Sequence, residues 1–398
     1  MGFNVENIEF LLLIAAIVAI LARRLRLPYT VGLVLAGGAL AFLPISFELP
    51  LTKELIFRAL LPPLIFDAAF RLHWQDLRKD FLVILILATV GVLISAGVIT
   101  LGMRVFAGWE AASALLFGVL ISATDPVAVI ALFKEQGITG RLHRLVEAES
   151  LFNDGTAAVA FNIALAIAEG GTVTVYSAAR SFFFVISLGL LCGALVGGFL
   201  LALAGRTEDH LAEITFTSVA AYGSFFLAEN FHGSGVLATL TAGLLMGNVG
   251  PMGALSEKGR EAVDSFWEYA GFVANSLIFL LIGMHEAHQH FGLVWRAVLL
   301  AIPLVLFGRA ASVSLSSALF HFSRWRIQRT HQTILIWGGL RGALALALVS
   351  GLPPQAPQRE TILITAFAVV AFSIIVQGVT ISPLLRRLGE LPQPQPED

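Results

Sequence analysis

The sequence predicts an all-α polytopic membrane protein, and three observations support this prediction. Of the 398 residues, 57% are hydrophobic and 13% are charged, whereas soluble domains contain roughly 25% charged residues. The apolar residues form long stretches of the length that a bilayer core requires, about 20 residues per helix. The basic residues gather in alternate connections between these stretches. The net charge of −2 and the single Cys192 exclude a basic nucleic-acid-binding field and a disulfide framework.

Thirteen apolar stretches, separated by short polar or charged connections, are predicted to be transmembrane helices. They cover residues 6–22, 28–44, 54–70, 80–103, 111–133, 143–168, 177–204, 211–229, 233–249, 262–284, 291–320, 331–352 and 360–385. Residues 1–388 are therefore expected to form one membrane domain. The proline-rich segment 389–398 has little to bury and is expected to be a short disordered cytoplasmic tail.

The distribution of Lys and Arg predicts the orientation of the chain. If the N-terminus lies outside, the connections after odd-numbered helices face the cytoplasm, where an excess of Lys and Arg is expected. These connections hold seventeen of the 25 basic residues: Arg23, Arg24, Arg26, Arg71, Arg78, Lys79, Lys134, Arg141, Arg144, Arg206, Lys258, Arg260, Arg324, Arg326, Arg329, Arg386 and Arg387. This asymmetry favours an odd number of helices, with the N-terminus outside and the C-terminus in the cytoplasm.

Two of the predicted helices are interrupted at corresponding positions. Thirteen helices divide as six, one linker and six, so that the second six would form an inverted-topology repeat of the first. The fifth stretch contains Thr124-Asp125-Pro126, and its counterpart, the twelfth, contains Gly338-Gly-Leu-Arg-Gly342. Because Pro126 lacks an N–H and clashes with the preceding turn, the backbone at Thr124 is expected to unwind and free carbonyls for a cation. Transporters with inverted repeats bind their substrates at such paired breaks.

Carboxylates inside the apolar stretches are the next candidates, because a charge at the centre of a membrane helix costs ~2.5 to 3.5 kcal/mol. Asp154 lies near the middle of the sixth stretch, and Ser150, four residues earlier, shares its side of the helix. Their oxygens suit Na⁺, Li⁺ or K⁺ rather than a transition metal. The alternative to a role of Asp125 in cation binding is a helix-capping carboxylate that touches no ion. The alternative for Asp154 is a purely structural role.

Arg341 requires a carboxylate partner, because it lies ~15 Å into the twelfth stretch and keeps its charge. We expect this partner to be Glu149, which lies at similar depth. That pairing would leave Asp154 unpaired and able to titrate. Asp67, toward the inner end of the third stretch, either lines the ion path or caps a helix near the interface.

Four motifs together resemble the bacterial NhaP-type sodium/proton antiporters, in the cation/proton antiporter family that includes the eukaryotic sodium/proton exchangers. The motifs are Leu61-Pro-Pro-Leu-Ile-Phe-Asp67, Ser122-Ala-Thr-Asp-Pro-Val-Ala128, Glu147-Ala-Glu-Ser-Leu-Phe-Asn-Asp-Gly155 and Trp337-Gly-Gly-Leu-Arg-Gly342. The resemblance implies a homodimer in the plasma membrane, without a cofactor. It also implies an ion-translocation core from predicted helices 4–6 and 11–13, and a dimerisation scaffold from helices 1–3 and 7–10.

The resemblance also assigns roles to individual residues. Asp154 would bind the cation or the proton, Ser150 and the Thr124 carbonyl would be ligands, and Asp125 would join through water. The residues implied to support this site are Glu149, Asn153, Arg341 and Pro126. Family members often have Glu where Asp67 stands, and the shorter aspartate argues against direct ligation by Asp67.

The activity implied is exchange of a monovalent cation for a proton, by competition at Asp154 with alternating access. The cation expected first is Na⁺, with Li⁺ and K⁺ as alternatives. Because Asn153 rather than a second acid precedes Asp154, one cation should exchange for one proton, with no net charge moved. The rival hypotheses are a passive cation channel or symporter, and an intramembrane aspartyl protease on Asp125 and Asp154. The protease should carry a Gly-x-Gly-Asp motif, which this sequence lacks.

Overall fold

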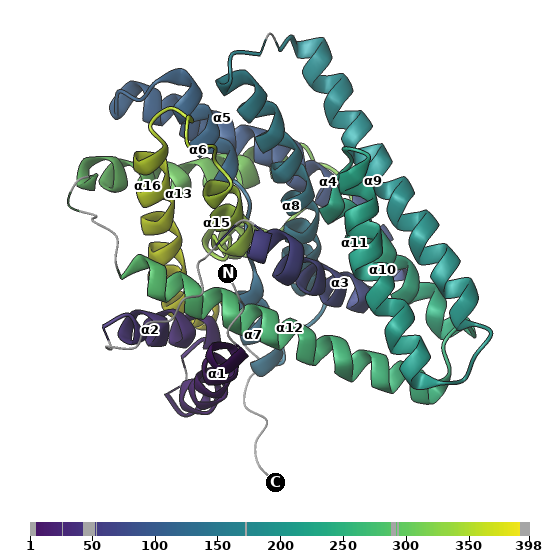
Figure 1. The fold of residues 1–398 in the computed structure, drawn as a ribbon. Coiled ribbons are helices and arrows are strands. Elements are labelled where there is room, and N and C mark those ends of the chain that lie inside the picture. The colour runs from purple at the N-terminus through teal and green to yellow at the C-terminus, as the bar shows by residue number, and fades with distance from the viewer. Residues whose placement is uncertain are drawn as a thin grey trace.

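The computed structural model describes residues 5–25, 27–42, 52, 54–171, 173–287, 292 and 294–390. Within these residues every regular element is a helix (Figure 1), which confirms the all-α prediction. In this part of the chain, seven helical segments are long and apolar enough to cross a membrane: Trp74–Phe106, Arg141–Ala168, Val175–Ala204, His210–Asn230, Glu257–His285, Trp295–Ala318 and Arg359–Leu388. Residues 391–398, most of the predicted tail, lie outside the described residues.

The helices of the first half follow the predicted apolar stretches, and three of those stretches contain two helical elements each in close succession. The elements are α1 (Val5–Leu25), α2 (Tyr29–Leu40), the π-helical η1 (Leu55–Leu60), α3 (Leu61–Arg71), α4 (Trp74–Ala88), α5 (Val90–Phe106), α6 (Ala111–Leu120), α7 (Val127–Glu135) and α8 (Arg141–Ala168). Only Thr89 separates α4 from α5, and its hydroxyl donates to the Leu85 carbonyl at 2.6 Å. These two helices therefore form one long run.

The second half has the same character, and its last two predicted stretches are each divided into shorter helical elements. Its elements are α9 (Val175–Ala204), α10 (His210–Asn230), α11 (Gly235–Val249), the 3₁₀ turn η2 (Gly250–Met252), α12 (Glu257–Glu286), α13 (Trp295–Ala318), α14 (Arg329–Trp337), α15 (Ala343–Ser350), α16 (Arg359–Phe372), the π-helical η4 (Ser373–Gln377) and α17 (Gly378–Leu388). Four long helices in this half begin at side chains that accept a backbone N–H, as N-caps do. These caps are Thr174, Asp209, Ser234 and Ser256.

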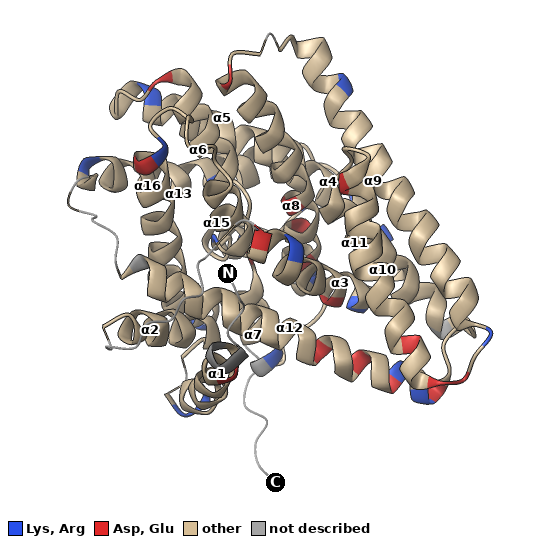
Figure 2. Cartoon of the chain, in the orientation of Figure 1, with Lys and Arg blue, Asp and Glu red and all other residues tan. Residues whose placement is uncertain are grey.

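The helices pack in two groups that meet along α8. In one group α12 lies along α2 and α3, and α11 lies against α3, α9 and α10. In the other, α5 lies along α13 and α6, and α8 packs on α4 and α6. Figure 1 shows α9, α10 and α11 on one side of α8 and α5, α6, α13 and α16 on the other. Most charged residues lie at helix ends and along the first half of α12 (Figure 2), and long stretches of the helices between them are uncharged.

Small residues allow close contact between α2 and α12. A Cβ on Gly37 would lie 2.1 Å from the Leu280 carbonyl oxygen, and one on Gly283 would lie 2.1 Å from the Val34 carbonyl oxygen. Larger side chains at these positions would push the helices apart. This use of glycine is typical of helix pairs in membranes, where burial of apolar surface drives no association and close van der Waals packing matters more.

Candidate functional site

Both predicted interruptions are present, and they meet inside the molecule. Residues 121–126 leave the helix between α6 and α7, and residues 338–342 do so between α14 and α15. The Asp125 N–H donates to the Leu340 carbonyl at 2.8 Å, which joins the two extended segments. Four helix ends therefore come together at one place.

Two side chains of opposite charge complement these helix ends. The Asp125 carboxylate accepts the N–H of Val127 at 3.0 Å and the N–H of Ala343 at 3.3 Å, so it caps both α7 and α15. Arg341 donates to the carbonyls of Ser122 and Ala123, both at 2.9 Å, just after α6 ends. Anions are favoured at helix N-termini and cations at C-termini. In this structure Asp125 therefore caps two helix N-termini.

Gly342 makes this arrangement sterically feasible. A Cβ at this position would lie 2.0 Å from Oδ2 and 2.5 Å from Cβ of Asp125. Because the Cβ of Asp125 stays in place when the side chain rotates, no rotamer of Asp125 removes this conflict. The close approach of the two broken segments therefore requires glycine here, which explains one residue of the Trp337–Gly342 motif.

Two side chains of α8 hold the unwound backbone at Thr124. The Thr124 N–H donates to Oδ1 of Asn153 at 3.2 Å, and Nδ2 of Asn153 donates to the Thr124 hydroxyl at 2.5 Å. The Ser150 hydroxyl donates to the Thr124 carbonyl. All three residues are at least 98% buried. Ser150 and the Thr124 carbonyl, both expected as cation ligands, are thus brought together.

The predicted ion pair between Glu149 and Arg341 is wrong, because Arg309 of α13 takes that place. Its Nη1 and Nη2 donate to the two Glu149 oxygens at 2.8 and 2.9 Å, and its Nε donates to the Leu335 carbonyl at 3.0 Å. The side chains of Glu149 and Arg309 are only 2% and 6% exposed. The sequence marks Arg309 as a charge inside an apolar stretch, but its partner depends on how the helices pack. Glu149 also accepts Nδ2 of Asn153 at 3.0 Å, so the pair supports the Asn153 clamp.

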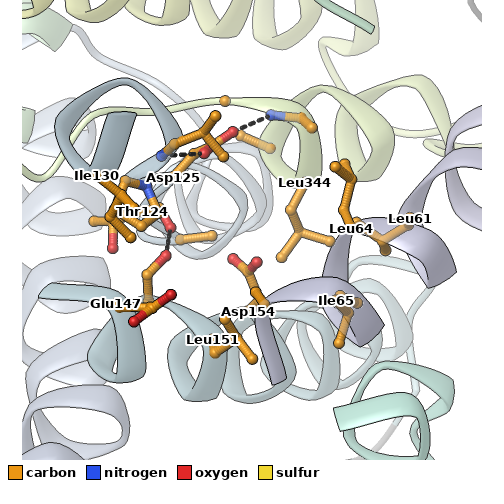
Figure 3. Close-up of a pocket in the computed structure, with 18 residues that line it drawn as sticks. Leu61, Leu64, Ile65, Thr124, Asp125, Ile130, Glu147, Leu151, Asp154 and Leu344 are labelled. Atoms are coloured by element: carbon orange, nitrogen blue, oxygen red, sulfur yellow. Dashed lines mark hydrogen bonds between the residues drawn. The ribbon is translucent and has the colours of Figure 1, made fainter. Parts of the chain in front are cut away.

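Asp154 lines a cavity of about 90 Å³ at the centre of this arrangement. Figure 3 shows its side chain directed into the space below Thr124 and Asp125, with Leu344 and Leu64 on the opposite wall. Five residues predicted for the site line the cavity: Thr124, Asp125, Pro126, Ser150 and Asp154. Within the described part of the chain, the Asp154 carboxylate has no hydrogen bond and no ion pair. Asp125, by contrast, is held by two backbone N–H groups.

Asp67 does not line this cavity. It accepts Nε of Arg71, one helical turn later on α3, at 2.8 Å. The same guanidinium lies 3.4 Å from the Asp264 carboxylate and donates to the Asp264 carbonyl at 3.1 Å. Asp67 thus belongs to a contact between α3 and α12. In the arrangement seen, it does not join the ligands around Asp154.

The cavity offers hydroxyl, carbonyl and carboxylate oxygens. No group of three or more His, Cys, Asp or Glu side chains suited to a metal ion occurs among the described residues. The oxygen donors are of the type that hard monovalent cations prefer. Chemically, the site can hold such a cation or a proton, and the Asp154 carboxylate favours one of them at a time.

Known proteins resemble this chain over nearly its whole length. A family model described as "Sodium/hydrogen exchanger, transmembrane" matches residues 12–387. The low-affinity Na⁺/H⁺ antiporter NhaS1 of Synechocystis sp. is 38% identical, across 98% of this chain and 77% of that protein. The Na⁺/H⁺ antiporter NhaH of Halobacillus dabanensis is 34% identical, across 98% and 99%. The fold matches the sodium proton antiporter MjNhaP1 of Methanocaldococcus jannaschii with a TM-score of 0.78 at 18% identity, covering 96% and 98%.

Proposed function

The chain belongs to the sodium/hydrogen exchanger family, and on this premise we propose that it exchanges Na⁺ for H⁺ across the membrane by competition at Asp154. The family consists of transporters rather than enzymes, so the intramembrane protease hypothesis is set aside. The observation that carries the proposal is the Asp154 carboxylate, which faces a cavity beside Ser150 and Thr124 and has no hydrogen bond or ion pair among the described residues.

Competition follows from the chemistry of a single carboxylate. When ionised, Asp154 attracts a cation whose lost hydration is replaced by the Ser150 hydroxyl and the Thr124 carbonyl. When protonated, it has lost the charge that makes cation binding favourable. Asp125 already accepts two backbone N–H groups, so we assign it a contact through water rather than direct ligation. Four further side chains hold the backbone around the cavity in position: Asn153, Glu149, Arg309 and Arg341.

The two packing groups support a moving core and a fixed scaffold. In this proposal α4–α8 and α13–α17 form the ion-translocation core, and α1–α3 and α9–α12 form the scaffold through which two copies dimerise. The proposal includes thirteen transmembrane crossings arranged as an inverted repeat. The two breaks, one between α6 and α7 and one between α14 and α15, lie at corresponding positions of the two repeats. In this proposal the protein lies in the inner membrane, with its N-terminus outside and its C-terminus in the cytoplasm. The orientation follows from the excess of Lys and Arg in the connections after odd-numbered predicted helices.

Exchange of one Na⁺ for one H⁺ should be electroneutral, because Asn153 is uncharged and leaves one titratable carboxylate at the cation. Purified protein in liposomes with an imposed pH gradient should dissipate that gradient only when Na⁺ is present on the side with the lower proton concentration. Setting the membrane potential with K⁺ and valinomycin should leave the initial rate unchanged. Substituting Li⁺ or K⁺ for Na⁺ in the same assay establishes selectivity.

The same assay separates the rivals. A passive channel would carry current and would collapse the gradient without a counter-cation, and a symporter would move Na⁺ and H⁺ in the same direction. A rate that varies strongly with the membrane potential would contradict the proposed one-to-one exchange. An Na⁺-independent proton flux would contradict exchange altogether.

A further inference from the structure

A second cavity, of about 250 Å³, lies next to the Asp154 cavity on the side where α8 begins. It is bounded by the ends of α3 and α7 and by the first turns of α4 and α8. His73, Lys134 and Gly140 line it and are exposed, so this cavity reaches the surface. We call it the vestibule. The basic connections place it on the side assigned to the cytoplasm.

Glu147 lines both cavities. It precedes Ser150, Leu151 and Asp154 by three, four and seven residues, so all four share one face of α8. Seven residues correspond to about 10 Å along a helix. Figure 3 shows Glu147 and Asp154 extending from the same helix at separate points along the cavity. Glu147 therefore lies where the vestibule and the Asp154 cavity adjoin.

The Glu147 carboxylate is available for such an ion. Its side chain is 13% exposed, and among the described residues the one basic side chain within 4.0 Å of its carboxylate is His143, whose Nδ1 lies 3.7 Å away on the preceding turn. It lacks the bidentate arginine that holds Glu149. Glu147 is thus an acidic group of the pathway that no strong ion pair neutralises.

The charges around Glu147 are mostly committed elsewhere. Arg71 is paired with Asp67 at 2.8 Å, and Arg144 lies 3.9 Å from Asp80. Asp76, also in the vestibule, is paired with Lys79 at 2.7 Å. Lys134 has no ion pair in the described part of the chain, and its charge acts on Glu147. A cation that enters the vestibule therefore meets the repulsion of Lys134 and the attraction of Glu147.

We propose that Glu147 is the first carboxylate that the cation meets, and that it transfers the cation from the vestibule to Asp154 while offsetting the charge of Lys134. The inference rests on the proposed antiport and adds a specific acidic step to its path. The step involves no covalent change. The cation exchanges part of its water shell for carboxylate oxygens at Glu147 before it reaches the less polar cavity beyond.

Exchange by the full-length protein in liposomes tests this step through the Na⁺ concentration that gives half-maximal rate. For Glu147→Gln this concentration should rise roughly tenfold, because the substitution removes a negative charge about 10 Å from Asp154 and so weakens the attraction of the cation. The maximal rate should change little, since Asp154 is intact. Lys134→Gln should lower the half-maximal Na⁺ concentration, and Glu147→Asp should stay near wild type because it keeps the charge.

Glu169→Gln is the matched control, since Glu169 is exposed just after the other end of α8. An unchanged half-maximal Na⁺ concentration in Glu147→Gln would overturn the inference while leaving the antiport proposal standing. Equal shifts in the same direction for Glu147→Gln and Lys134→Gln would also overturn it, because they would indicate a structural effect. Absence of Na⁺-dependent exchange in the wild type would overturn the proposed function itself.

Discussion

Asp154→Asn is expected to reduce Na⁺-dependent proton exchange to the level of protein-free liposomes. The amide preserves the shape of the side chain but carries no negative charge and cannot take up and release the proton. Because the Asp154 carboxylate has no hydrogen bond or ion pair in the described part of the chain, the variant should fold and assemble like the wild type. Fluorescence-monitored proton flux, together with size-exclusion profiles in detergent, measures both properties.

Asp209→Asn is the matched control for this substitution. The Asp209 side chain is 62% exposed and caps α10 by accepting the Leu211 N–H at 3.0 Å. Asparagine caps helices about as well as aspartate, so this variant makes the same chemical change without a cost to folding. It should exchange at the wild-type rate. Exchange retained in Asp154→Asn would remove Asp154 from its proposed role.

Glu149→Gln and Arg309→Met are each expected to destabilise the fold by about 3 to 5 kcal/mol, because each leaves an unpaired charge or donor in a buried ion pair. The pair is bidentate and nearly inaccessible. The double variant should recover a large part of this loss, since it removes both partners. Thermal unfolding of the detergent-solubilised protein, followed by the loss of monodisperse protein on heating, measures the three changes.

Lys79→Met provides the comparison for an exposed pair. Lys79 and Asp76 lie 2.7 Å apart with side chains 62% and 40% exposed, and such surface pairs contribute only about 0 to 1 kcal/mol. Its thermal transition should therefore stay close to that of the wild type. If Arg309→Met unfolds at the same temperature as Lys79→Met, then the buried pair does not stabilise the site.

Much of the site could be predicted from local patterns. Pro126 and the glycines at 338, 339 and 342 mark the two breaks, because their backbone effects act within a few residues. The helical period alone places Ser150 and Asp154 on one face of α8. Such features depend on spacing along one segment, and the structure contains them as predicted.

Other features depend on which helices are neighbours, and spacing carries no information on that. Arg309 and Arg341 are both arginines within apolar stretches, and only the packing decides that Arg309 reaches Glu149 while Arg341 binds backbone carbonyls. Asp67 looked equally suited to the ion path or to a cap, and its pairing with Arg71 beside α12 settles its position in this arrangement. The place of Glu147 between two cavities likewise becomes visible only when α3, α7 and α8 are assembled.

The dependence of Na⁺ affinity on pH tests the central claim most directly. Wild-type protein in liposomes should need more Na⁺ for half-maximal exchange as the pH falls, because protons then occupy Asp154 more often. Within the range where this carboxylate titrates, the half-maximal Na⁺ concentration should rise by up to about tenfold per pH unit, as expected for two ligands that exclude each other. A half-maximal Na⁺ concentration that stays constant across pH, while the protein remains folded and active, would contradict competition at a single carboxylate.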